Sequence, residues 1–196
     1  NPVAQWAPCF GPTVADFNND GHEDVFLSQN LDTGNHEWGR MDAGHGLLLL
    51  GDGEGSLNAI PSTASGIRLK NEQRGTATAD FNQDGKMDLA VLERGEGAHL
   101  FVNQTEHTGV TVSLEGPSAN PHCIGARLQK INLQTGNVYG PAKEIQSGSG
   151  YRSLNSLKHV FAHPGKAFQI QVTWPNGKIS RHSIPSGITK VTLQQP

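Results

Sequence analysis

One nine-residue pattern occurs twice in this chain and constrains its fold more than any other feature. The first copy runs from Asp16 to Asp24 and the second from Asp80 to Asp88, 64 positions later (80 − 16). Each reads Asp-x-Asn-x-Asp-Gly-x-x-Asp and precedes a short apolar run bounded by turn residues. Such runs are typical of buried strands. The duplication indicates a repeat protein whose units consist of short strands.

The repeated pattern places oxygen donors at fixed positions of a tight loop. A hard divalent cation takes roughly six to eight oxygen ligands, and the Gly at position six permits the sharp turn that directs donors to one point. We therefore predict two Ca2+ sites, with calcium preferred over magnesium. The same composition also suits a hairpin turn without metal, but its recurrence with a further Asp favours the ion. The expected ligands are Asp16, Asn18, Asp20 and Asp24, with the carbonyl of His22, and Asp80, Asn82, Asp84 and Asp88, with the carbonyl of Lys86.

The loops do not fit the helix–loop–helix calcium site. That site requires a bidentate Glu at position twelve, on a following helix. Leu27 and Val91 stand at those positions, inside strand-like runs. We therefore expect each loop to join two strands.

The first copy carries an insertion that the second lacks. The strand-like stretches behind the loops, 47–50 and 99–103, are only 52 positions apart (99 − 47), so 12 extra residues (64 − 52) fall within 30–46. This segment mixes aromatic and charged side chains, which are common at binding surfaces, although it could also be a long loop anchored by its Trp. The candidate ligand-binding residues are His36, Trp38, Arg40 and His45.

The second half of the chain predicts a separate β-rich domain. Strand-like segments at 110–114, 124–131, 143–146, 168–174 and 190–193 are separated by turn signals. We expect an all-β protein with a first domain at 1–108 and a second at 109–196. No long window has a helical period, and 24 Gly with 11 Pro suit a turn-dense β fold.

Composition excludes several classes of protein. The net charge of -3 gives no basic surface for nucleic acid, and the longest apolar run, 47–50, cannot span a membrane. Cys9 and Cys123 form no CxxC motif; they could form one disulfide or remain as two buried thiols. Asn103 begins a glycosylation sequon that matters only if a eukaryote secretes the protein. The start at Asn1 suggests a mature, processed or truncated chain.

These motifs resemble two known families. The segment at 15–26 resembles the FG-GAP (integrin-alpha-like, VCBS-type) repeat of β-propellers. The segments NPHCIGA at 120–126, GSGYRSLNS at 148–156 and VTWPNGK at 172–178 resemble the ASPIC/UnbV domain of secreted proteins similar to the cartilage acidic protein family. The resemblance implies two propeller-type blades, a small β-sandwich-like domain, and calcium at the loop positions given above. Cys123 and the VFAH run at 160–163 depart from the ASPIC/UnbV pattern.

The resemblance implies a calcium-binding, non-catalytic recognition or adhesion module. We expect it to be secreted or extracellular (periplasmic or at the cell surface in a bacterium), with a protein or glycan ligand. The alternatives are part of a propeller-based polysaccharide lyase or hydrolase, argued from fold analogy alone, and a purely structural subunit. Two blades cannot close a propeller, which needs about four. Missing blades, a second polypeptide or the C-terminal domain must therefore cover the open face.

Overall fold

The computed structural model describes residues 2–32, 37, 40–41, 44–163, 165 and 167–196. Almost all regular structure in these ranges is strand, which confirms the all-β prediction. Two single-turn helices, η1 (Pro2–Gln5) and α1 (Ser62–Ser65), are the exceptions among the described residues. No helix in this part of the chain has the length and apolar character to cross a membrane.

The first repeat forms a four-stranded antiparallel sheet. Its strands, in the order β1-β2-β5-β6, are Cys9–Ala15, Asp24–Gln29, Leu47–Gly51 and Leu57–Ile60. The Asp16–Asp24 loop joins β1 to β2, as the sequence predicts. The insertion holds a two-residue strand pair, β3 (Leu31–Asp32) and β4 (Arg40–Met41).

The second repeat forms a three-stranded sheet on the same plan. Strands β7 (Gln73–Ala79), β8 (Asp88–Glu93) and β9 (Gly97–Phe101) are antiparallel and in chain order. The Asp80–Asp88 loop joins β7 to β8, so both loops occupy the same place in their sheets. The blade-like duplication expected from the sequence is therefore present in the structure.

The two repeats share one apolar core. Phe26 on β2 is fully buried, and Leu89 and Val91 on β8 are 4% and 1% exposed. Because side chains alternate along a strand, Leu92 lies on the opposite face of β8, where it is 53% exposed. The second sheet therefore has a buried apolar face toward the first sheet and a partly apolar face toward solvent.

The C-terminal part forms a sandwich of two sheets. One sheet has the order β13-β10-β16 and pairs β10 with β16 in parallel; its strands are His159–Ala162, Gly109–Glu115 and Lys190–Gln194. The other has the order β12-β11-β14-β15; its strands are Val138–Glu144, Arg127–Ile131, Phe168–Thr173 and Ile179–Ile184. Their inner faces enclose buried side chains that include Phe161 and Trp174.

Strand boundaries in the sandwich differ from the sequence prediction. The expected strand at 124–131 begins only at Arg127, because 120–126 is a hydrogen-bonded turn with Gly125 at a φ of 90°. Of the expected strand at 143–146, only 143–144 lie in a strand, at the end of β12, and residues 145–146 follow it. Strands β13 and β15 were not expected. On β15 only Ile184 is buried, so its sequence lacks a clear apolar pattern.

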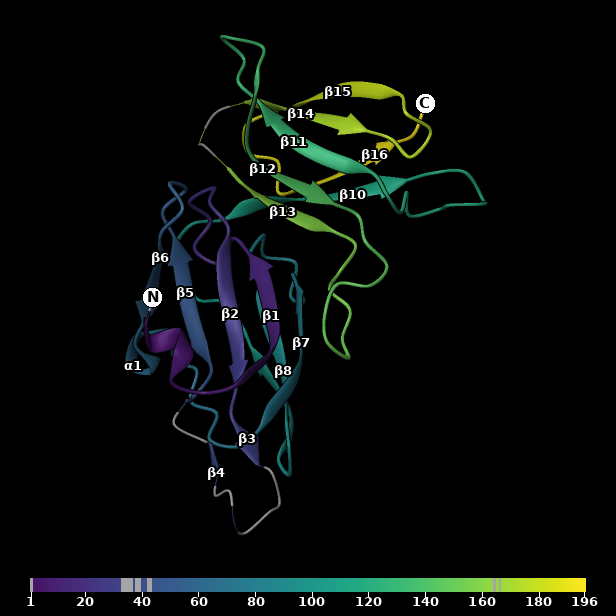
Figure 1. Cartoon of the computed structure of the whole chain (residues 1–196). Coiled ribbons are helices and arrows are strands. Elements are labelled where there is room, and N and C mark those ends of the chain that lie inside the picture. Colours follow the sequence, from purple (N-terminus) through teal and green to yellow (C-terminus); the bar gives the residue numbers. More distant parts are fainter. Residues whose placement is uncertain (1, 33–36, 38–39, 42–43, 164, 166) are drawn as a thin grey trace.

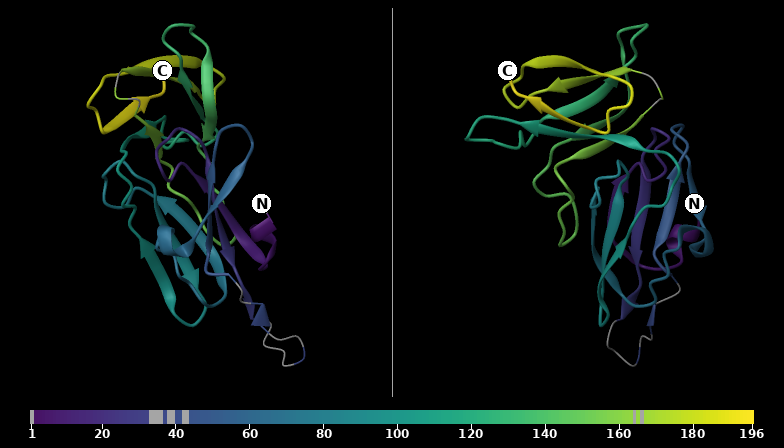
Figure 2. Two further views of the ribbon diagram at one scale, coloured as in Figure 1. Left: turned by 90° about the vertical axis from the view of Figure 1, so that its left-hand side faces the viewer. Right: turned by 180° about the vertical axis from the view of Figure 1, so that it is seen from behind.

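The sandwich lies against the ends of the two repeat sheets where the acidic loops lie (Figure 1). Both views in Figure 2 keep it at that end. Strand β10, the first of the sandwich, begins at Gly109, which matches the expected boundary, although the division into separate domains stays a prediction. The connection from β12 to β13 runs back along β7 (Figure 1) and joins the sandwich to the second repeat.

Candidate metal loops and an interdomain cleft

The first acidic loop is held in shape by its own carboxylates. The two oxygens of Asp16 accept hydrogen bonds from the backbone N–H groups of Asp20 (3.1 Å) and Gly21 (2.9 Å). The Asp20 carboxylate accepts from the His22 N–H and from the Asn18 amide, both at 2.8 Å. Backbone and side-chain donors therefore draw the acidic groups together on one side of the turn.

The second loop repeats this arrangement bond for bond. Asp80 accepts from the N–H groups of Asp84 (2.9 Å) and Gly85 (3.1 Å). Asp84 accepts from the Lys86 N–H and the Asn82 amide, both at 3.0 Å. Gly85 has a φ of 80°, and a Cβ there would lie 2.6 Å from the Gly109 carbonyl oxygen, so the turn requires glycine.

The ninth-position carboxylates have a structural task in both loops. Asp24 is fully buried and accepts from the N–H of Phe17 (2.7 Å), within its own loop, and from the N–H of Gly51 (2.9 Å), at the end of β5. Burial raises the pKa of Asp24 to about 6, against the lowering effect of these two N–H groups. A carboxylate placed this way connects the loop to the next strand of its sheet.

Asp88 makes the same two contacts in the second repeat. It is fully buried and accepts from the N–H of Phe81 and of Asn103, both at 2.8 Å. Residues 51 and 103 are thus equivalent, which agrees with the offset of 52 in the sequence (103 − 51). Each carboxylate oxygen has a second lone pair, so these bonds do not prevent coordination.

The donor chemistry of the loops suits a hard cation. Carboxylate and amide oxygens converge within nine residues, and the recurring positions of the pattern carry no sulfur or imidazole ligand that would favour a softer metal. Within the described ranges, no three His, Cys, Asp or Glu side chains are already arranged as a metal centre. The ten ligand positions and the two calcium ions therefore stay predictions. If metal binds the second loop, Asp80, Asn82 and Asp84 would hold it.

The loops differ in what surrounds them. Asp16 is 3% exposed and shares a cavity of about 10 Å³ with Lys130 and Lys143 of the sandwich. Burial raises the pKa of Asp16, which the charge of Lys143 partly offsets, and burial lowers the pKa of Lys130. Asp80 is only partly buried and instead accepts a hydrogen bond from the Thr111 hydroxyl (2.7 Å).

Two asparagines that the sequence did not single out as structural residues join the repeats. The Asn19 amide donates to the carbonyl oxygens of Gly85 (3.2 Å) and His107 (3.0 Å). The Asn103 amide donates to those of Phe17 (2.7 Å) and Met87 (3.0 Å). Glycosylation replaces one amide hydrogen, so a glycan at Asn103 would cost one of these bonds. The sequon stays an untested prediction.

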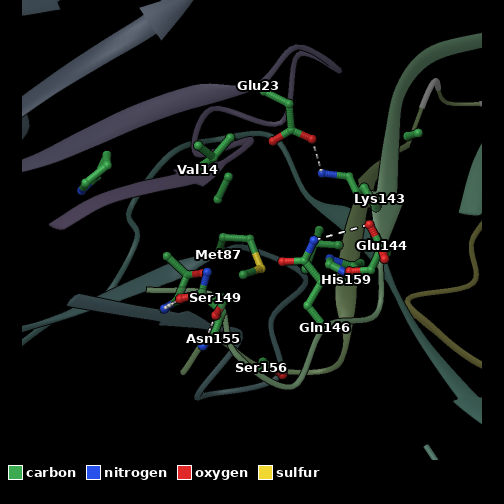
Figure 3. Close-up of a pocket in the computed structure, with 15 residues that line it drawn as sticks. Val14, Glu23, Met87, Lys143, Glu144, Gln146, Ser149, Asn155, Ser156 and His159 are labelled. Atoms are coloured by element: carbon green, nitrogen blue, oxygen red, sulfur yellow. Dashed lines mark hydrogen bonds and ion pairs between the residues drawn. The ribbon is translucent and has the colours of Figure 1, made fainter. Parts of the chain in front are cut away.

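A cleft of about 310 Å³ lies between the repeats and the sandwich (Figure 3). Lys143 forms an ion pair with Glu23 (2.8 Å) on one side of it. His159 lies nearby, with its Nε2 3.1 Å from the Glu144 carbonyl oxygen, and burial together with the charge of Lys143 lowers its pKa to about 4. Apolar side chains, including Met87, complete the lining.

Three residues of the segment GSGYRSLNS, which the sequence singled out, line this cleft (Figure 3): Ser149, Asn155 and Ser156. Asn155 and Ser156 run along β7: the Thr78 N–H donates to the Asn155 side chain (3.0 Å), and the Ser156 N–H donates to the Thr78 carbonyl (2.8 Å). The Ser149 hydroxyl accepts from the Asn155 N–H (2.8 Å). This motif therefore docks the sandwich onto β7, the edge strand of the second repeat that lies beside β1 of the first.

The candidate ligand-binding residues of the insertion are not brought together by the described structure. His36 and Trp38 lie outside the described residues. Arg40 begins β4, but its side chain is outside the description, and His45 is exposed. Their role stays a prediction.

Both cysteines are free. Cys123 is buried and Cys9 is exposed. The disulfide considered from the sequence is therefore not formed in this structure, and only one of the two thiols is buried.

Comparison with known proteins agrees with this geometry. Residues 16–91 match the model of the FG-GAP-like repeat family, a match that includes both acidic loops. The chain is 27% identical over 186 residues to cartilage acidic protein 1 of Homo sapiens, covering 92% of this chain and 27% of the relative. The Mus musculus protein of the same name is 28% identical over 184 residues, covering 88% and 26%. The predicted resemblance is confirmed. The chain spans about a quarter of the length of these relatives.

Proposed function

We propose that this chain is a calcium-binding, non-catalytic recognition or adhesion module that acts outside the cytoplasm. The observation that carries the proposal is the acidic loop itself, formed twice with the same hydrogen bonds in repeats of the FG-GAP type. The relatives bear a name that refers to cartilage, a tissue rich in extracellular matrix. A protein or glycan outside the cell is the ligand class that fits this setting.

Thermal unfolding with and without chelator tests the calcium part of the proposal. An ion that binds only the folded chain stabilises it by about 2.7 kcal/mol at a hundredfold excess over its Kd. We expect EDTA to lower the Tm, and calcium to restore it at lower concentration than magnesium. An unchanged Tm in EDTA would contradict a calcium-stabilised fold.

The solvent-facing side of the second sheet supports a larger assembly. Leu92 on β8 and Leu100 on β9 are 53% and 55% exposed, and Ala90 pairs with Leu100 on the same face. An apolar face of this kind marks an interface in repeat proteins, whose units bury their faces against neighbours. We propose that further blades of the same type cover it, from the same longer chain or from a second polypeptide. The sandwich docks on β7 and leaves these leucines exposed.

Light scattering after size-exclusion chromatography tests the interface. We expect this chain to self-associate at high concentration, and the Leu92→Ser/Leu100→Ser variant to remain monomeric. Leu133→Ser, at an exposed turn of the sandwich, is the matched control. A wild-type chain that stays monodisperse and monomeric would contradict an interface at this face.

A further inference from the structure

The two loops have the same internal bonds but face different groups. In the first loop, the cavity beside Asp16 and Gly21 holds about 10 Å³, at most the volume of one water molecule. The sandwich closes this cavity with Tyr139 and Phe161. The Asp16 end of the first loop is therefore covered by protein, whereas the Asp20 side chain is exposed.

Two ammonium groups stand at that covered side. The Nζ of Lys143 lies 2.8 Å from the Glu23 carboxylate, and its side chain is only 10% exposed. The Nζ of Lys130 lies 3.7 Å from where a Cβ of Gly21 would be. Both lysines line the cavity together with Asp16. Glu23 of the first loop is thus paired with Lys143, and Asp16 has the two lysine side chains beside it.

The second loop has no comparable pair among the described side chains. The Thr111 hydroxyl occupies the place beside Asp80 and provides a neutral oxygen. The Nζ of Lys86 is bonded to the Thr105 carbonyl, and that of Lys190 to the Gln83 side chain (3.2 Å), at position four of the loop, which supplies no ligand. The charge of the three Asp residues here is left for an external cation.

We propose that the two loops have different occupants: the second loop takes calcium, whereas the ammonium groups of Lys130 and Lys143 balance the first loop and dock the sandwich there. This rests on the proposed calcium function for the second loop. A divalent ion coordinated by Asp16 would share the small cavity beside that residue with the side chains of Lys130 and Lys143, and two ammonium groups in a partly dehydrated site would repel it. The repeated sequence motif therefore encodes one metal site and one interdomain contact.

Calcium titration of the EDTA-treated chain by isothermal calorimetry tests the assignment. We expect one calcium ion per chain. Asp84→Ala should remove this binding and Asp20→Ala should preserve it. The Lys130→Met/Lys143→Met variant should gain a second ion with at least tenfold higher affinity than the wild-type first loop. Lys178→Met is the control, since its Nζ donates to the Pro196 carbonyl (3.4 Å) in the same sandwich.

Each other outcome is decisive. Two ions of similar affinity in the wild type, or loss of binding in Asp20→Ala rather than Asp84→Ala, would overturn the assignment. No binding in either the wild type or the double Lys variant would overturn it as well. No binding in the wild type but one ion in the double variant would support the role of the lysines while rejecting calcium at the second loop. Circular dichroism checks that the double variant folds. If it does not, the comparison of Asp20→Ala with Asp84→Ala is sufficient to test the assignment.

Discussion

The two acidic loops form the same turn in different surroundings. Phe17 in the first loop is 7% exposed, whereas its counterpart Phe81 in the second is 47% exposed. The sandwich packs on the first loop through lysines, and the second meets it through the Thr111 hydroxyl. A nine-residue pattern can therefore fix a local conformation completely while the partner of its charges depends on residues far along the chain.

The largest effect should come from the buried ninth-position carboxylates, where we expect the loops to behave alike. Asp24→Ala and Asp88→Ala each leave two buried or partly buried N–H groups without an acceptor, at about 1–3 kcal/mol per group. The unfolding free energy, measured by urea denaturation in EDTA, should fall by about 3–5 kcal/mol in both variants.

Asp52→Ala is the matched control for these variants. Asp52 also accepts two backbone N–H bonds, from Glu54 (2.8 Å) and Ser56 (3.0 Å), but in an exposed turn where water can replace it. Its loss should therefore cost much less stability than the loss of Asp24 or Asp88. A loss in Asp24→Ala or Asp88→Ala that occurs only with calcium present would show that these residues act through the metal instead.

The change in stability on adding calcium should differ between variants of the two loops. At a hundredfold excess over Kd, calcium should stabilise the wild type by about 2.7 kcal/mol. Differential scanning calorimetry should show the same calcium-dependent rise in Tm for Asp20→Ala, and none for Asp84→Ala. Equal loss of the response in both variants would mean that the loops bind metal as one unit.

A lower pH should weaken the contact between the sandwich and the first repeat. His159, beside Lys143 and Glu144, has a folded-state pKa of about 4, below the ordinary 6.5, so the folded chain favours the neutral ring. Between pH 6.5 and 4 the His159 ring binds a proton in the unfolded chain but not in the folded chain. The free energy of unfolding therefore falls as the pH falls. At pH 5 the loss should be about 2 kcal/mol.

Urea denaturation at pH 7 and pH 5 measures this difference. His159→Gln should lose less stability on acidification than the wild type. The exposed His122→Gln should behave as the wild type does. An identical pH response in His159→Gln and the wild type would contradict the role of His159.

Sequence reasoning located the loops and their flanking strands because those features depend on neighbours in the chain. Asp16 and Gly21 act within one turn, and the run at 89–92 is apolar enough to be recognised as a strand. The partners of the first loop could not be predicted. Lys143 lies 120 residues from Glu23, and nothing in its own segment indicates an acidic partner. Strands such as β15, with one buried residue, likewise owe their pairing to neighbouring strands.

The smallest predicted effect concerns a position where the repeats differ at equivalent contacts. Gly51 and Asn103 offer the same N–H to the buried Asp of their repeats, but only Asn103 has an amide that also bonds the Phe17 and Met87 carbonyls. Asn103→Gly gives the second repeat the residue of the first and preserves the N–H. We expect a loss of about 1–2 kcal/mol in urea denaturation, because two partly buried carbonyls lose their donor.

The reverse exchange, Gly51→Asn, does not fit the geometry of the first repeat. The two exchanges should therefore have different effects. A Cβ at residue 51 would collide with the Glu23 carbonyl oxygen, so Gly51→Asn should destabilise the chain rather than add a bond. Gln104→Gly, at the exposed neighbouring position, controls for the greater backbone freedom of glycine. If Asn103→Gly lowers the free energy of unfolding no more than Gln104→Gly does, the amide hydrogen bonds do not couple the repeats. A larger loss would identify Asn103 as a side chain through which the second repeat supports the first loop.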